Sequence, residues 1–191
     1  MNGIFRVNSL WYVIILSTLL LVSSSYASEK SDNVDRASVP DLFSPSGWEG
    51  DLQSVKIEYE CPLKPHSGQY CQKWTYSGEL SDGAGWAGVC WQYPANSWTR
   101  EKGRDMSAFT ILSFWARGEK GGEVISFRTG GGADEFSKIQ GPIKLNTDWQ
   151  KFSFDLAKDN LSNVQNGFCW SVQRMDNPDG CVFYIDDMKF E

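Results

Sequence analysis

Short runs of alternating apolar and polar residues follow one another along the chain from residue 55 onward. In the clearest run, Phe152, Phe154 and Leu156 alternate with polar residues, the period of two that a half-buried β-strand shows. Comparable strand-like runs cover residues 55–59, 71–76, 86–93, 110–117, 123–129, 168–173 and 182–190. Clusters of Gly, Asn, Asp and Ser separate the runs. The pattern predicts a single all-β domain built as a β-sandwich.

The amino terminus has the pattern of an export signal. Residues 11–22 are apolar and uncharged, follow the basic Arg6, and are too few for the roughly 20 residues of a membrane-spanning helix. Ser25 and Ala27 then supply the small residues that a signal peptidase reads. We therefore expect residues 1–27 to be a cleaved signal peptide; the alternative is an uncleaved anchor. The expected location is secreted, periplasmic or extracellular, without stable membrane insertion.

A polar stretch without periodicity follows the signal. It contains Pro40 and Pro45 and lacks any strand-like alternation. Residues 28–47 are therefore predicted to form a flexible arm, which leaves residues 48–191 for the β-sandwich domain.

Charge and composition restrict the chemistry. The chain of 191 residues has a formal net charge of −6, which argues against a nucleic-acid partner. It contains nine Trp but a single His, His66, which disfavours His-based catalysis and favours binding by flat rings. Asp186 and Asp187 are neighbours on a predicted strand and point to opposite faces, so they cannot flank one glycosidic bond. The sequence indicates a protein that is not an enzyme; a hydrolase or lyase is the less favoured alternative.

Five cysteines are present in a chain expected to be exported, where disulfides form. Cys61 and Cys71 bracket a loop rich in turn residues, and we predict a disulfide between these two. Cys90 and Cys169 each precede a Trp within a strand-like run, and pairing and simple burial are equally open for them.

The last ten residues, 182–191, resemble the final strand of galactose-binding-like jelly rolls, a group that includes the carbohydrate-binding modules of glycoside hydrolases. Residues 66–68, 112–118 and 149–156 resemble three further segments of these modules, in the same order along the chain. The resemblance covers residues 48–191. It implies a jelly-roll sandwich that binds a polysaccharide or another glycan, although this fold carries many functions.

Two groups of side chains are candidates for a ligand-binding site. Trp86, Trp91, Tyr93 and Trp98 lie on or just after one predicted strand, where they either stack against sugar rings or fill the core. Of these, Trp91, Tyr93 and Trp98 are the candidate ligand residues.

The second group follows from alternation. Burial of Leu112 and Phe114 turns Trp115 and Arg117 outward, and the next strand turns Arg128 outward. We expect all three on one sheet face, where guanidinium groups suit diols or carboxylates; the alternative is an ordinary solvated face with salt bridges.

A calcium site is expected from carboxylates. Asp186 near the end of the chain, together with Glu49 and Asp51 near the start of the domain, offers the hard oxygen ligands that Ca²⁺ prefers. Related jelly rolls often hold such an ion, which implies a structural role; the alternative is a set of surface carboxylates. The sequence as a whole favours a secreted, non-catalytic carbohydrate-binding protein, and the alternative is an envelope protein that binds a protein partner.

Overall fold

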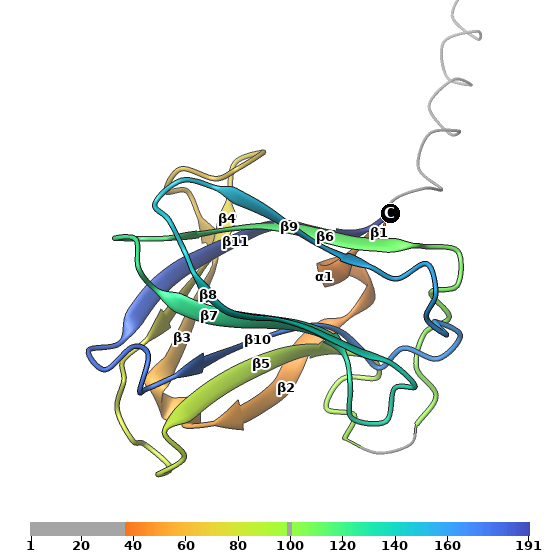
Figure 1. Ribbon diagram of the computed structural model, residues 1–191, viewed down its shortest axis with the longest axis horizontal. Coiled ribbons are helices and arrows are strands. Elements are labelled where there is room, and N and C mark those ends of the chain that lie inside the picture. The colour runs from red at the N-terminus through yellow and green to blue at the C-terminus, as the bar shows by residue number, and fades with distance from the viewer. Residues whose placement is uncertain (1–36, 99–100) are drawn as a thin grey trace, which may run out of the picture. The chain divides into compact units, whose positions relative to one another are not determined.

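Two antiparallel β-sheets packed face to face make up the domain in the computed structural model, which describes residues 37–98 and 101–191 (Figure 1). Sheet A has the order β3 (Val55–Cys61), β4 (Cys71–Tyr76), β11 (Cys181–Phe190), β6 (Ile111–Gly118) and β9 (Gln150–Asp155), with β1 (Ala37–Ser38) paired to β11. Sheet B has the order β2 (Ser44–Gly50), β5 (Trp86–Gln92), β10 (Asn166–Gln173), β7 (Val124–Gly130) and β8 (Ser137–Lys144). Two short helices, α1 (Val39–Leu42) and η1 (Leu52–Ser54), flank β2. The predicted β-sandwich is confirmed.

Aromatic side chains from both sheets fill the space between the layers. Trp74 of sheet A meets Trp91 and Trp170 of sheet B edge to face, with ring centroids 5.5 and 4.8 Å apart. All three are at most 1% exposed. Such contacts add to the large apolar area that each ring buries. Much of the high Trp content therefore serves the core.

Most strands begin and end within two residues of the predicted runs, but β1, β2 and β8 were not predicted. In β8 the apolar Ile139 and Ile143 are four residues apart, and Gly141 and Pro142 interrupt the segment. This strand lies at the edge of sheet B, where a Pro that lacks an N–H is tolerated. The alternation that identifies half-buried strands is absent there.

The prediction of a flexible arm is wrong for residues 37–47. Val39 and Phe43 are at most 2% exposed, and the rings of Phe43 and Phe190 lie 6.0 Å apart. Strand β2 pairs with β5 along its length. Two apolar anchors and one set of strand pairs order a segment whose composition is otherwise typical of a loop.

Two predictions for the amino terminus, the signal peptide at 1–27 and the first part of the arm, lie outside the described residues. In the part of the chain that the structure covers, no helix has the length and apolar character needed to span a membrane.

The two outer faces of the sandwich receive different residues than predicted. Strand alternation correctly turns Trp115 and Arg117 outward on β6 and Arg128 outward on β7. However, β6 belongs to sheet A and β7 to sheet B. The expectation that all three residues share one sheet face is wrong, because the turn between the strands carries the chain from one layer to the other.

Candidate functional site

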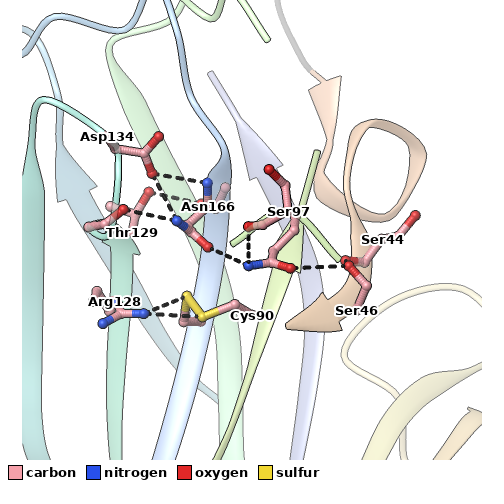
Figure 2. The surroundings of a disulfide bond; sticks show 12 residues. Ser44, Ser46, Cys90, Ser97, Arg128, Thr129, Asp134 and Asn166 are labelled. Atoms are coloured by element: carbon pink, nitrogen blue, oxygen red, sulfur yellow. Dashed lines mark hydrogen bonds between the residues drawn. A yellow bond between two sulfur atoms is a disulfide. The ribbon is translucent and has the colours of Figure 1, made fainter. Parts of the chain in front are cut away.

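A disulfide lies at the centre of the outer face of sheet B. Cys90 on β5 and Cys169 on β10 are directly opposite in the strand register and are bonded, with their Cα atoms 4.1 Å apart (Figure 2). Apart from Arg128, which lies opposite Cys169, their neighbours on the same face are small. Gly47 lies beside Cys90 on β2, and Ser126 and Ser171 lie opposite each other one pair further along. The middle of this face is therefore low.

The predicted disulfide between Cys61 and Cys71 is wrong, since both thiols are free. The loop does bring the two residues opposite each other across β3 and β4, as expected. Cys71 Sγ donates to the carbonyl oxygen of Cys61 at 3.5 Å. Burial, followed by the negative field of Cys61, raises the pKa of Cys71 to about 12. The thiolate is the form that reacts, so this thiol is held in its inert state.

We call the low middle of this outer face, along β5 from Trp86 to Gln92, the groove. Gly47 and Gly88 keep the groove free of side chains. A Cβ at Gly88 would lie 3.3 Å from Cζ3 of Trp86, so the six-membered ring of Trp86 lies beside Gly88 on this face. A Cβ at Gly47 would lie 2.7 Å from Cδ of Gln92. A side chain at Gly88 would therefore displace the ring of Trp86, and one at Gly47 would displace the buried amide of Gln92.

A hollow of about 100 Å³ opens beside the disulfide. Arg128 and Ile139, a cross-strand pair on β7 and β8, form one wall. The two cysteines, the two serines, Phe127 and Trp170 complete the lining. Ile139 is 66% exposed, so the hollow is open to solvent along the edge strand.

Buried amides fix one end of the groove. Gln92 Nε2 donates to the carbonyl oxygen of Ser97 at 3.0 Å and to Asn166 Oδ1 at 3.2 Å (Figure 2). Asn166 Nδ2 in turn donates to the carbonyl oxygen of Gly131 at 2.9 Å and to Asp134 Oδ2 at 3.2 Å. These bonds join the loop after β5 and the loop after β7 to the same two amides. The rim of the groove is thereby held in one arrangement.

Asp134 is the carboxylate nearest to this network. Burial raises the pKa of its carboxyl group, and hydrogen bonds from the backbone N–H groups of Gln165 (2.6 Å) and Asn166 (3.0 Å) offset part of that rise. Both oxygens are engaged by these donors. Asp134 therefore holds its own loop and offers little to a ligand.

Arg128 lies over the disulfide. Its Nη2 is 3.2 Å from the sulfur of Cys90 and 3.5 Å from that of Cys169, both weak acceptors (Figure 2). Its Nε is buried and has no hydrogen-bond partner among the described residues. The prediction that Arg128 faces outward is confirmed; a role in ligand binding stays a prediction.

The aromatic residues predicted with it have different surroundings. Trp91 is 0% exposed and belongs to the core, so its assignment to a ligand site is wrong. Tyr93 is 37% exposed, with the guanidinium carbon of Arg104 3.9 Å from its ring centroid. Trp98 is 54% exposed and follows Ser97, so it lies at the amide end of the groove. Of the three, only Trp98 adjoins the groove with a largely exposed ring.

Trp115 and Arg117 lie on the other outer face, under the loop of residues 62–70. His66 stacks on Trp115 with ring centroids 3.8 Å apart. The guanidinium carbon of Arg117 is 3.7 Å from the ring centroid of Tyr184, and its Nη2 donates to the carbonyl oxygen of Leu63 at 2.8 Å. Arg117 is only 6% exposed. Both predicted ligand residues instead fix a loop.

The three predicted calcium ligands do not come together. Asp51 is buried and accepts backbone N–H bonds from Asp82, Ala84 and Gly85 at 2.7–3.0 Å, which outweigh burial and hold its pKa below the usual value. Glu49 lies on β2 in sheet B, whereas Asp186 lies on β11 in sheet A, where it accepts the N–H of His66. These residues do not fit a calcium site. Within the described ranges, no group of three or more His, Cys, Asp or Glu residues could hold a metal ion.

Sequence reasoning grouped Trp86 with Trp91, Tyr93 and Trp98 but did not assign it to the ligand site, and it left the pairing of Cys90 and Cys169 open. A usable signal existed in β5, where large residues at Val89 and Trp91 alternate with Gly88 and Cys90. The face with the large residues is the core, and the face with the small ones is the groove.

No protein-family model matches the sequence, and no curated protein matches it. Solved structures similar to the chain include a family 11 carbohydrate-binding module from Clostridium thermocellum in complex with a β-1,3-1,4-mixed-linked tetrasaccharide. It is 12% identical over 84% of this chain and 91% of its own, with a TM-score of 0.49. A family 61 module solved with β-1,4-galactotriose is 18% identical over 78% of this chain and 90% of its own, with a TM-score of 0.47. A family 30 module of a Clostridium thermocellum cellulosomal cellulase gives the same four values. All three are carbohydrate-binding modules, the group that the sequence resembles.

Proposed function

We propose that this protein is an exported, non-catalytic carbohydrate-binding protein whose ligand lies on the outer face of sheet B. The observation that carries the proposal is the groove itself, an open floor of small residues with an indole ring, a guanidinium group and a fixed rim around it. Binding sites of this kind combine apolar surface with a few polar groups that are already in place.

The groove offers both kinds of contact that a sugar needs. The C–H face of a sugar ring packs on flat or apolar surface, which Trp86, Ile139 and the disulfide supply. Hydroxyl groups need directional partners, and Arg128 has unpaired donors beside the hollow. Trp86 and Gln92 stand six residues apart on β5, about 20 Å at the usual rise of a strand. That length suits an elongated ligand.

Export is supported by the disulfide. Bonds of this type persist in oxidising compartments outside the cytosol. The amino-terminal pattern of a charged residue, an apolar run and small residues points the same way.

A binding role without catalysis fits the carboxylates near the groove. Hydrolysis of a glycosidic bond uses two carboxyl groups about 5–10 Å apart that flank the bond. Asp134 is already engaged by N–H donors, and Asp186 lies on the opposite sheet. A protein partner, the alternative raised from the sequence, gains no support.

Binding of the secreted chain to a panel of soluble and insoluble polysaccharides tests the proposal. Trp86→Ala removes the half-buried indole ring from the groove and is expected to weaken binding by about tenfold, equal to about 1.4 kcal/mol. Trp115→Ala is the matched control, because it removes the same ring from the covered face. It should lower the free energy of unfolding and leave binding unchanged.

The opposite pattern would place the ligand on sheet A: loss of binding with Trp115→Ala and normal binding with Trp86→Ala. Absence of binding to every polysaccharide in the panel would reject the proposed function.

A further inference from the structure

Arg128 forms no salt bridge within the described part of the protein, although its charge contributes to lowering the pKa of Asp134. No carboxylate oxygen of residues 37–98 or 101–191 lies within 4.0 Å of its guanidinium nitrogens, whereas Lys73, Lys138 and Lys189 each have such a partner. Its hydrogen-bond acceptors are two sulfur atoms, both reached by the same Nη2. Nε is buried, so Nη1 is the nitrogen that has no acceptor and is open to a ligand.

The side chain is nevertheless held in one place. It rests on the disulfide, and Gly131 runs alongside it: a Cβ at Gly131 would lie 3.5 Å from Nε and 3.6 Å from Cδ of Arg128. Gly131 has a φ of +93°, a conformation that residues with side chains rarely adopt. The backbone can therefore approach the guanidinium group closely, and ordering that group adds little cost when a ligand binds.

The hollow of about 100 Å³ next to Arg128 has room for a small charged group and not for a whole sugar ring buried below the surface. The planar guanidinium fork matches the two oxygens of a carboxylate or sulfate in a bidentate pair. A hydroxyl group would occupy a donor but leave the charge uncompensated. A carboxylate or sulfate group both accepts the hydrogen bonds and compensates the charge.

We infer that the glycan bound on sheet B is acidic and places a carboxylate or sulfate group against Arg128; this inference rests on the proposed function. Ring surface lies on the disulfide and Ile139, and the oxyanion points into the hollow. The protein has a net charge of −6 and does not attract polyanions in general. A preference for an acidic glycan would therefore arise from Arg128 and not from the overall charge of the protein.

Pairs of oligosaccharides that differ only in charge provide the test. Oligogalacturonate is compared with its methyl ester, and a sulfated galactan oligosaccharide with its desulfated form, each by titration calorimetry with the secreted chain. We expect at least one acidic form to bind about tenfold or more tightly than its neutral counterpart. The pair that shows the difference tells whether the anion is a carboxylate or a sulfate.

Variants of Arg128 locate the preference. Arg128→Met is expected to weaken binding of the acidic form by about tenfold and of the neutral form by less than about threefold. Arg128→Lys keeps the charge but not the fork, and should give an intermediate loss. Lys144→Met is the control: it removes one positive charge from an exposed residue opposite Val124, at the far end of the same pair of strands. It should change neither affinity by more than about twofold.

Equal binding of the charged and neutral forms would overturn the inference alone, and so would a preference that persists in Arg128→Met. The comparison of charged and neutral forms needs only the unmodified protein, so a variant that fails to fold does not prevent the test. If none of these probes and no polysaccharide of the panel binds, the proposed function and the inference both fail.

Discussion

The outer faces of the two sheets carry the same set of residue types and use them differently. Each face has two cysteines opposite each other on neighbouring strands, with an arginine close by: Cys61, Cys71 and Arg117 on sheet A, and Cys90, Cys169 and Arg128 on sheet B. On sheet A the loop of residues 62–70 lies over the set, and its backbone carbonyls bind Arg117 and Trp149. On sheet B, Arg128 has only sulfur atoms as acceptors.

The difference lies in what the chain itself supplies. Carbonyl oxygens from a loop satisfy Arg117, so this residue stabilises the fold. Arg128 lacks such partners among the described residues and lies beside a hollow, so its interactions remain to be made by a ligand. Identity and outward orientation of a side chain are therefore insufficient to assign a binding role; coverage by the rest of the chain decides it.

The largest expected effect concerns the cysteine pairs. Replacing Cys90 and Cys169 together by Ala removes a bond that closes a loop of 79 residues, and should lower the free energy of unfolding by about 4 kcal/mol. Cys61→Ala on the covered face should cost about 1 kcal/mol, since a buried free thiol acts as a small apolar group. Urea unfolding of the variants measures both values.

Peptide mapping without reductant provides an independent check on the same comparison. It should recover Cys90 linked to Cys169 and the other cysteines as free thiols. Recovery of Cys61 linked to Cys71 would show that both faces carry a disulfide and would remove this contrast between them.

Local alternation predicted much of this arrangement, and long-range contacts account for the rest. Burial of Leu112 and Phe114 correctly turned Arg117 outward. No local pattern tells that β6 and β7 join different sheets, or that a loop 50 residues earlier in the chain covers Arg117. The pairing of Cys90 with Cys169 likewise depends on the register of β5 against β10, which forms only in the folded domain.

The candidate site was predictable only as far as local strand alternation determines it. Outward exposure of Arg128 follows from its strand. The hollow beside it depends on Cys90, Ile139 and Cys169 from three other strands. The core takes up Trp91, so that this ring is not part of the site. The sequence predicts the chemical types present, and the sheet order determines which of them meet.

The next largest effect compares the two arginines directly. Arg117→Met removes a hydrogen bond to the partly buried carbonyl of Leu63 and a contact with the ring of Tyr184. It should lower the free energy of unfolding by about 2 kcal/mol without changing glycan affinity. Arg128→Met should lower it by less than about 1 kcal/mol, because it loses only contacts to sulfur. Denaturant unfolding and a binding titration on both variants give the four values. Equal loss of stability in the two variants would mean that Arg128 is also a structural residue.

The smallest effect concerns how the loop on sheet A is held. Asp187 accepts hydrogen bonds from Ser67 Oγ at 2.6 Å and lies 2.6 Å from His66 Nδ1. Burial would raise the pKa of Asp187, but the bonds from Ser67 and His66 outweigh it and lower the pKa below its usual 3.8. The stabilisation is therefore present at neutral pH and is lost as the pH falls through the lowered pKa. The neighbouring Asp186 has a pKa raised by burial, so it takes up its proton first on acidification.

Asp187→Asn isolates the charge, because Asn tolerates the φ of +51° that Asp187 adopts. The pair is partly exposed, so we expect the global free energy of unfolding to fall by less than about 1 kcal/mol. Locally, the amides of His66 and Ser67 should exchange hydrogen several times faster, since the loop opens without unfolding the sandwich. In the unmodified protein their protection should decrease in two steps on acidification: first as Asp186, which accepts both N–H groups, takes up its proton, and then at lower pH as Asp187 does. The variant should lack only the second step. Glycan affinity should be the same in both, because the groove lies on the other sheet. An affinity that changes with Asp187 would show that the two faces are coupled, and the contrast between a covered structural face and an open binding face would then be incomplete.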